Sequence, residues 1–275
     1  MRNPPKFTSL GSLGQVCRLG LATRGDSNLQ AEDVLEAIER GVNYLNWCGH
    51  PDGMSRAVCS MAPQDRAGIL VAVQLSARDA GAAARELAEI QEQLGTDVID
   101  IVTYYYVEHE EEWARITAPG GAAQVLEQAR AAGTVRAIGL TSHQRPLAAR
   151  IASGGRLDLL MIRYNAAHRG AEREIFPITR KRGMPVVTFT SLRWGALTRP
   201  TPDDPPDFRP PSSMEWYRFA LCHPDVGVAL MAPSDHRELV ENLNLLHDWR
   251  GLEDGQYAAM QAHGDRVRRH AGNFL

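Results

Sequence analysis

The sequence predicts one barrel of eight parallel β-strands, each followed by an α-helix, over residues 1–275. Short apolar segments alternate along the chain with longer amphipathic segments, and eight strand–helix units are counted if the short segment 42–45 is a strand. Parallel neighbours require a helical crossover between them, so this alternation indicates a parallel sheet, and eight units close into a barrel. A length of 275 residues is ordinary for one such domain.

The strands are predicted from short apolar runs. The run ILVAVQL at 69–75 is uninterrupted, as expected for a strand buried on both faces, and 98–107 is rich in β-branched and aromatic residues. In chain order, the predicted strands cover residues 17–23, 42–45, 69–75, 98–107, 135–140, 157–164, 185–190 and 226–231.

The helices are predicted from apolar residues at helical spacing, as in AEDVLEAIER at 31–40. Gly95 and Gly133 end two of them, because glycine readily adopts the left-handed conformation of a helix C-cap. The acidic run 109–112 is typical of a solvated helix start. The predicted helices cover residues 31–40, 83–94, 122–132, 146–153, 172–182, 215–222 and 237–247.

Two structural alternatives remain open at this point. An open, doubly wound sheet would normally carry a G-x-G-x-x-G loop after its first strand, and the segment from Leu21 to Gly25 has no such pattern. Prolines crowd the segment 199–213, which excludes a helix or a central strand there. This segment is either a stiff surface loop or a cover over the mouth of the barrel.

The composition is that of an ordinary globular protein, with 44% hydrophobic and 23% charged residues. A net charge of −3 gives no basic surface for nucleic acid or membrane. The N-terminal segment MRNPPKFTSLG has no apolar region typical of a secretory signal, and no apolar run is long enough for a transmembrane helix. Four cysteines without a C-x-x-C pair predict neither a disulfide framework nor a metal site, and they suit a cytoplasmic protein. The oligomeric state is left open.

Several motifs in the expected order resemble the aldo-keto reductases. They are GVNYLNWCGHPDGMS at 41–55, LGTDVIDIVTYYYVE at 94–108, GTVRAIGLTSH at 133–143, the segment 161–192 with its Y-N-A-A-H-R-G-A-E core, and HPDVGVALMAPSDHRELVENL at 223–243. The resemblance runs from about residue 9 to residue 246 and implies the barrel with a short N-terminal hairpin. It also implies NADP(H)-linked reduction of a small carbonyl compound.

In that family a Tyr donates the proton, a Lys lowers the pKa of the Tyr, an Asp holds the Lys, and a His orients the carbonyl. All four positions are changed here. The resemblance places Asn46 at the Asp, His50, Pro51 or Asp52 at the Tyr, Gln74 at the Lys and Tyr105 at the His.

The loss of the Asp and the Lys together removes both charges, so neither is left without a partner. Asn46 and Gln74 could satisfy one another by hydrogen bonds as a structural plug, without the cost of burying charges. Without a neighbouring ammonium, a phenol keeps a pKa of about 10 and relays protons poorly at neutral pH.

The resemblance also implies the cofactor positions. Phe189 keeps the aromatic that stacks on the nicotinamide, whereas Met161 replaces a Gln and cannot make its hydrogen bond. Arg237 or Arg193 could face a 2′-phosphate and favour NADP. The implied cofactor-binding residues are Thr141, Ser142, Met161, Phe189, Arg237, Glu241 and Asn242.

Three functions are compatible with these residues. The first is an oxidoreductase with altered acid–base groups, and the second is an inactive barrel that acts as a binding or partner protein. The third is a cofactor-free isomerase or lyase in which His50 and Tyr105 move protons, helped by Asp52 and by an inward-pointing Arg163. For His50 and Asp52, the plainer interpretation is an exposed turn, CGHPDG. Trp47 and Trp194 flank the same predicted mouth.

Overall fold

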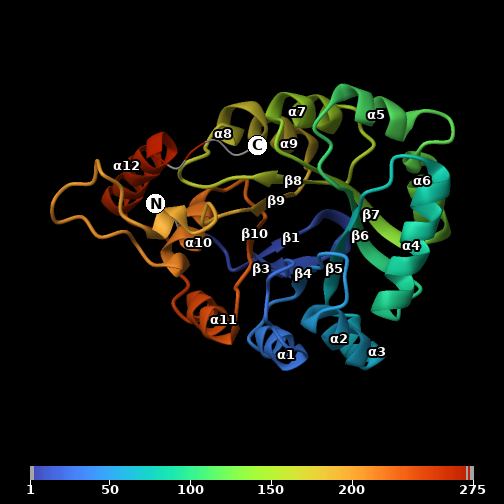
Figure 1. Ribbon diagram of the computed structural model, residues 1–275, viewed down its shortest axis with the longest axis horizontal. Helices are drawn as coiled ribbons and strands as arrows, with labels where there is room; N and C mark the ends of the chain where they lie inside the picture. The colour runs from blue at the N-terminus through green and yellow to red at the C-terminus, as the bar shows by residue number, and fades with distance from the viewer. Residues whose placement is uncertain (1–2, 271, 273–275) are drawn as a thin grey trace.

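The computed structural model describes residues 3–270 and 272. Eight parallel strands close into a barrel in the order β10-β3-β4-β5-β6-β7-β8-β9, which confirms the predicted fold class (Figure 1). In chain order the barrel strands are β3 (Leu19–Ala22), β4 (Tyr44–Asn46), β5 (Leu70–Leu75), β6 (Ile99–Tyr104), β7 (Val135–Ser142), β8 (Leu159–Arg163), β9 (Val186–Phe189) and β10 (Val228–Met231).

A short hairpin precedes the barrel. Strand β1 (Phe7–Ser9) pairs antiparallel with β2 (Gln15–Cys17), and the 3₁₀ turn Gly11–Leu13 joins them. Leu10, Leu13 and Val16 pack with the side chains inside the barrel, so the hairpin closes the end where the strands begin. The opposite end is left for the loops that follow the strands.

Helices surround the barrel, and most predicted ones are found close to their expected limits. The predicted helix 172–182 is divided into α8 and α9 around Ile175, where Pro177 occupies the first turn of α9. The 17-residue helix α12 near the C-terminal end was not predicted. The helices are α1 (Ala31–Glu39), α2 (Gly53–Ser60), α3 (Pro63–Arg66), α4 (Ala80–Leu94), α5 (Glu110–Thr117), α6 (Ala122–Ala132), α7 (Arg145–Ser153), α8 (Ala171–Glu174), α9 (Phe176–Arg182), α10 (Ser213–Cys222), α11 (His236–Leu243) and α12 (Asp254–His270).

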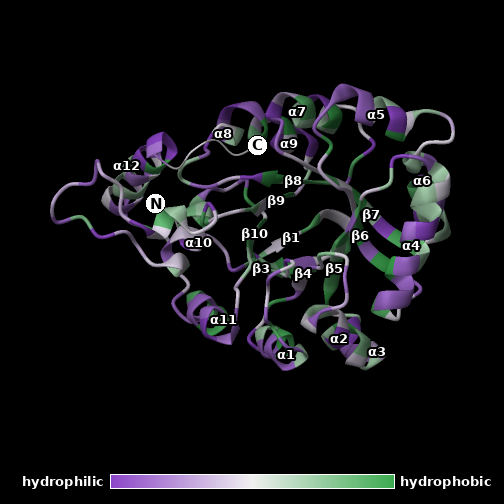
Figure 2. Cartoon of the chain, in the orientation of Figure 1, coloured by the Kyte–Doolittle hydropathy of each residue, from purple (hydrophilic) through white to green (hydrophobic). Residues whose placement is uncertain are grey.

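Two apolar layers follow from the alternation of side chains along the strands. In β6, Ile101 packs inside the barrel, whereas Val102 and Tyr104 pack outward against the helices. Figure 2 shows the helices carrying both hydrophobic and hydrophilic residues, as expected for helices that cover a core with one face. Packing on both faces therefore fixes the strands. The loops at the strand ends are outside this core, so their residues can differ without disturbing it.

The proline-rich segment 199–213 extends beside α12 rather than across the barrel (Figure 1). Asp204 accepts hydrogen bonds from the His263 ring and the Arg266 side chain of α12, and Phe208 stacks on His263 with ring centroids 4.8 Å apart. Among the described residues of this segment, Arg199 borders the cavity at the mouth of the barrel. These contacts with α12 support the interpretation of segment 199–213 as a surface loop, and not as a cover over the mouth of the barrel.

In the part of the chain that the structure describes, no helix is both long enough and apolar enough to cross a membrane.

Candidate functional site

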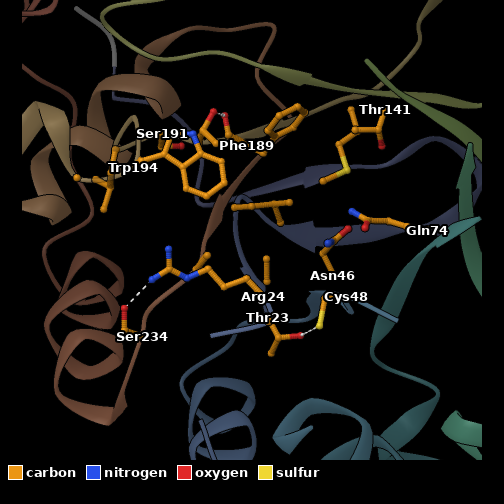
Figure 3. A pocket seen from close by; sticks show the side chains of 18 of the residues that line it. Thr23, Arg24, Asn46, Cys48, Gln74, Thr141, Phe189, Ser191, Trp194 and Ser234 are labelled. Carbon is orange, nitrogen blue, oxygen red and sulfur yellow. Dashed lines mark hydrogen bonds between the residues drawn. The ribbon is translucent and has the colours of Figure 1, made fainter. Parts of the chain in front are cut away.

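A cavity of about 570 Å³ opens at the end of the barrel where the strands finish. Side chains from the strand ends and the loops that follow them line it (Figure 3). The polar and charged side chains among them are Thr23, Arg24, Asn46, Cys48, His50, Gln74, Tyr105, Tyr106, Thr141, Thr190, Ser191, Arg199, Tyr217, Ser234 and Glu238.

Asn46 and Gln74 lie next to one another at the ends of β4 and β5, and both point into the cavity (Figure 3). Asn46 is buried, yet its Oδ1 has no hydrogen-bond partner in the described part of the chain. The pair therefore does not close on itself through this oxygen, as a self-satisfied structural plug would. A buried acceptor without a partner is costly, and a ligand or a water molecule in the cavity could satisfy it.

The three consecutive tyrosines at the end of β6 do not simply alternate. Tyr104 packs outward against Trp113, with ring centroids 5.8 Å apart, as expected. Both Tyr105 and Tyr106 border the cavity, and their rings lie 4.1 Å apart. Tyr106 has a φ of 40°, so the backbone leaves the strand conformation there and a second phenol turns inward.

The chemistry of Tyr106 follows from its surroundings. Burial raises the pKa of Tyr106 above its usual value, and the neighbouring Tyr105 raises it further. A phenol with a raised pKa stays protonated at neutral pH, so Tyr106 is a hydrogen-bond donor. Its ring also packs on the His143 ring, with centroids 4.5 Å apart and the planes tilted by 32°. The Nδ1 atom of His143 in turn lies 3.3 Å from the Glu108 carboxylate.

Trp47 anchors the loop that follows β4 to the core of the protein. This indole is fully buried in the outer core, and its Nε1 donates to the carbonyl oxygen of His50 at 3.0 Å. Gly49 has a φ of 88°, which lets the chain turn back and brings Cys48 and His50 together. His50 lines the cavity, as its candidate role requires, within the turn that the sequence also predicted.

Asp52 begins helix α2 instead of lining the cavity. Its Oδ1 accepts a hydrogen bond from the backbone N–H of Ser55 at 2.9 Å, and the Ser55 hydroxyl accepts one from the backbone N–H of Asp52. This reciprocal arrangement satisfies two N–H groups at the start of the helix. The second carboxylate oxygen, Oδ2, lies 3.5 Å from the sulfur of Cys48.

Three of the implied cofactor residues line the cavity: Thr141, Met161 and Phe189. Thr141 Oγ1 is buried and has no hydrogen-bond partner in the described part of the chain, and the same holds for Ser191 Oγ. Ser142 is turned away, because its hydroxyl accepts a hydrogen bond from the backbone N–H of Gln144 at 3.0 Å. Polar groups for a ligand are thus present at Thr141 and Ser191.

The other implied cofactor residues lie outside the residues that line the cavity. Arg237 and Glu241 are exposed on α11, and the Arg237 Nη1 atom lies 3.6 Å from the Glu241 Oε1 atom. Asn242 is buried, and its side-chain oxygen accepts a hydrogen bond from the Ser213 hydroxyl of α10 at 2.8 Å. This contact ties two helices together.

Arg24 is a cation of the cavity that sequence analysis did not select. Its guanidinium donates to the Ser234 hydroxyl at 2.6 Å (Figure 3). It also lies 2.9 Å from the carboxylate of Asp26. Arg163, expected to add a charge if it pointed inward, is half-buried on β8 and is not a lining residue. Burial lowers the pKa of Arg163, and the nearby Arg145 lowers it further.

The two tryptophans expected at the mouth differ in position. Trp194 borders the cavity and is 57% exposed, whereas Trp47 belongs to the core beneath the loop. Cys48, Arg24 and Ser191 were missed by sequence analysis, although each follows a barrel strand. That position was the available signal, because barrel sites are built from the segments after the strands.

The closed barrel and its lined mouth define a protein of the (β/α)8 class with a polar, aromatic cavity at the C-terminal face. A family model described as "Aldo/keto reductase family" matches residues 18–216, and the chain belongs to this family.

Curated relatives match smaller parts of the chain. The NADH-specific methylglyoxal reductase of Escherichia coli is 29% identical over 41% of this chain and 34% of its own length. The D-threo-aldose 1-dehydrogenase of a Pseudomonas species is 31% identical over 42% of this chain and 35% of its own length. The chain therefore matches only about a third of each of these relatives.

Solved structures match nearly the whole chain. An aldo-keto reductase from Bacillus halodurans in its holo form has a TM-score of 0.75 at 17% identity and covers 95% of this chain and 96% of its own. An aldo-keto reductase from Klebsiella pneumoniae in complex with NADPH has a TM-score of 0.74 at 15% identity, covering 96% of each chain. At such low sequence identities, the similarity to these structures establishes the fold alone.

Proposed function

We propose that this chain is an oxidoreductase that binds NADP(H) in the cavity and reduces a small carbonyl compound with rebuilt acid–base residues. The observation that carries the proposal is the set of unpartnered buried oxygens around the cavity: Asn46 Oδ1, Thr141 Oγ1 and Ser191 Oγ. These groups have lost water without gaining a protein partner, which is expected where a polar ligand supplies the missing hydrogen bonds.

The residues present fit parts of a nicotinamide nucleotide. Phe189 offers a ring face for the nicotinamide, and the free Thr141 hydroxyl can bond its carboxamide. Arg24 and Ser191 can hold phosphate oxygens, because a guanidinium and a hydroxyl both donate to anions. Ser142 and Met161 add no hydrogen bond to the carboxamide, so we expect weaker binding than the full set of family residues would give.

A bound nicotinamide would supply the hydride. The protein would then orient the carbonyl and deliver the proton. Tyr105 and Tyr106 both border the cavity and can donate hydrogen bonds to a carbonyl oxygen. His50, in the loop after β4, also lines the cavity, and an imidazole can act as a proton donor or acceptor. Asn46 and Gln74 leave this half of the site uncharged.

The relatives support this reaction type by their names, which are those of reductases and dehydrogenases, and one matching structure contains NADPH. Small aldehydes such as methylglyoxal are therefore the first substrates to test. The choice between NADPH and NADH is tested in parallel.

The first experiment is a fluorescence titration of the full chain with NADPH and with NADH. We expect saturable binding that Phe189→Ala weakens by about tenfold through the loss of the stacking face. Phe7→Ala, in the hairpin at the other end of the barrel, is the matched control and should leave binding unchanged. An absence of binding at high micromolar concentrations of both nucleotides would contradict the proposal.

The second experiment measures turnover across a panel of aldehydes. Tyr105→Phe should lower kcat by about 100-fold, since a positioned proton donor contributes on this scale. Tyr104 faces outward, so the kcat of Tyr104→Phe should stay within about twofold of that of the unchanged chain. Nucleotide binding without turnover of any aldehyde would instead favour the binding-protein alternative.

A cofactor-free isomerase or lyase is the second candidate, because His50 and Tyr105 border the same cavity. Its test is a proton-exchange assay on carbonyl compounds without nucleotide. Exchange that disappears in the His50→Ala, Tyr105→Phe double variant would support this function, and exchange that persists would exclude these two residues from it.

A further inference from the structure

We propose that Cys48, His50 and Asp52 form a binding site for a divalent metal ion of the Zn²⁺ type at the rim of the cavity. One ligating atom from each residue lies within 4.8 Å of the others. This site goes beyond the proposed function and does not depend on it, because nothing in the donor set requires a nucleotide.

The three donors match the ligand preferences of zinc. A thiolate, an imidazole nitrogen and a carboxylate oxygen are its usual protein ligands, at about 2.0–2.3 Å from the ion. Two such ligands of a tetrahedral ion are therefore about 3.5 Å apart. The Cys48 sulfur lies 3.5 Å from Asp52 Oδ2 and 2.8 Å from His50 Nδ1. The distance between the Cys48 sulfur and the Nδ1 atom of the exposed His50 ring would need to lengthen by less than about 1 Å to reach this spacing.

Local structure holds the donors in place before any ion binds. The buried Trp47 fixes the backbone of His50, and Gly49 provides the turn that folds His50 back toward Cys48. The two carboxylate oxygens of Asp52 make different contacts. Oδ1 caps helix α2, and Oδ2 faces the sulfur of Cys48. Little conformational entropy would be lost on binding, which favours a real site over a chance cluster.

The position of the cluster gives the ion a free face. Cys48 and His50 both line the cavity, so an ion held between them borders it. Three protein ligands with one open position are typical of catalytic zinc sites, whereas structural sites use four. The Thr23 hydroxyl lies 3.4 Å from the Cys48 sulfur and can donate a hydrogen bond to it, which would hold the sulfur in place for an ion (Figure 3). The fourth ligand would be a water molecule or a ligand oxygen in the cavity.

The motif explains why sequence analysis predicted no metal site. The donors are spaced C-x-H-x-D, not in the C-x-x-C pattern of structural zinc. In an extended segment these alternate residues would share one side, and the Gly49 turn brings them closer still. The competing interpretation is that the same contacts are only hydrogen bonds within a turn, and it predicts no affinity for metal.

The test is a titration of the chelator-treated full chain with Co²⁺, followed by competition with Zn²⁺. We expect one Co²⁺ per chain, with a sulfur-to-cobalt charge-transfer band that Zn²⁺ abolishes. Cys48→Ser should remove the band. Asp52→Asn should weaken binding by more than about 100-fold, because loss of a group that only hydrogen-bonds a metal ligand already costs about 10–100-fold. Asn is a good N-cap, so Asp52→Asn keeps helix α2 capped.

The exposed thiol provides the matched control. Cys59→Ser should leave the band and the affinity unchanged, since Cys59 lies on α2 outside the cluster. An absence of the band, or a band that survives Cys48→Ser, would overturn the proposal. The metal titration contains no nucleotide, and the nucleotide titration contains no added metal. Failure of one proposal is therefore distinguishable from failure of the other.

Discussion

Asp100 is a charged residue buried in the wall of the barrel, on β6. It accepts a hydrogen bond from the backbone N–H of Val71 on β5 at 2.9 Å. It also pairs with Arg66 and with Arg136 of β7, each at 2.7 Å. One carboxylate thus connects three neighbouring strands, and both of its oxygens are used. A buried charge is tolerated when it is paired and hydrogen-bonded in this way.

We expect Asp100→Asn to lower the free energy of unfolding by about 2 kcal/mol. Breaking a fully buried pair costs about 3–5 kcal/mol, and the partly exposed arginines reduce that figure because water can reach them. Urea denaturation measures the change. Asp97→Asn, on an exposed side chain just before the strand, is the control and should shift the midpoint little. Equal shifts would mean that the arginine pairs do not stabilise the barrel.

At the scale of elements, the segment 199–213 and helix α12 are held together by a small polar cluster. His263 is fully buried, and its two ring nitrogens face Asp204 at 3.0 Å and the carbonyl oxygen of Leu197 at 3.1 Å. Arg266 also pairs with Asp204 and lies over the ring of Phe208 at 4.8 Å. The prolines keep the segment stiff, and the cluster fixes where it lies.

This cluster predicts a pH dependence. Burial raises the pKa of Asp204, but hydrogen bonds from Thr201, His263 and Arg266 outweigh it and lower the pKa to about 2. An unfolded Asp has a pKa of about 3.9, so the folded chain holds this proton less tightly. The stabilisation is therefore present above pH of about 4 and is lost as the pH falls toward 2.

Thermal unfolding of Asp204→Asn between pH 6 and pH 3 tests this. We expect a lower Tm than that of the unchanged chain at pH 6 and a smaller difference at pH 3. Asp207→Asn changes an exposed carboxylate of the same segment and should show no such trend. A difference in Tm that stays constant with pH would rule out the titration of Asp204 as its cause.

At the scale of the whole molecule, α12 packs against the barrel through a close contact at Gly264. A Cβ atom on Gly264 would lie 2.4 Å from the carbonyl carbon and oxygen of Ala166, in the segment after β8. Around it, Trp216, Phe219 and Met260 form an apolar cluster separate from the barrel interior. The final helix is thus part of the structure that supports the mouth of the barrel.

Gly264→Ala should destabilise the protein by about 1–3 kcal/mol, because the backbone of Ala166 cannot move aside easily. Gly255→Ala is the matched control in the same helix. A Cβ at Gly255 meets no atom within 4 Å, so that variant should be neutral or gain up to about 1 kcal/mol from helix propensity. Urea denaturation compares the two. If both variants unfolded at the same urea concentration, the close contact between Gly264 and Ala166 would not be what makes Gly264→Ala unstable.

The strands could be predicted from the sequence because a strand buried on both faces is a nearly continuous apolar run. The run 69–75 is observed as Leu70–Leu75, and 185–190 is observed as Val186–Phe189. Helix α12 was missed because its apolar residues are few and pack on a local cluster. Helix α2 was not predicted, and Asp52, which the sequence left open between a site residue and a turn residue, is its N-cap.

By itself, the sequence determined the (β/α)8 barrel, whereas the changes at the four positions on which the family relies stay a prediction from the resemblance. These follow from local periodicity and from residue identity at fixed motif positions. The tertiary structure alone decided which side chains meet at the mouth. Tyr106 enters the cavity through a positive φ, and Cys48 reaches both His50 and Asp52 through the turn at Gly49. The physical reason is that the backbone conformation of a loop, unlike the period of a strand, leaves little trace in the pattern of apolar residues.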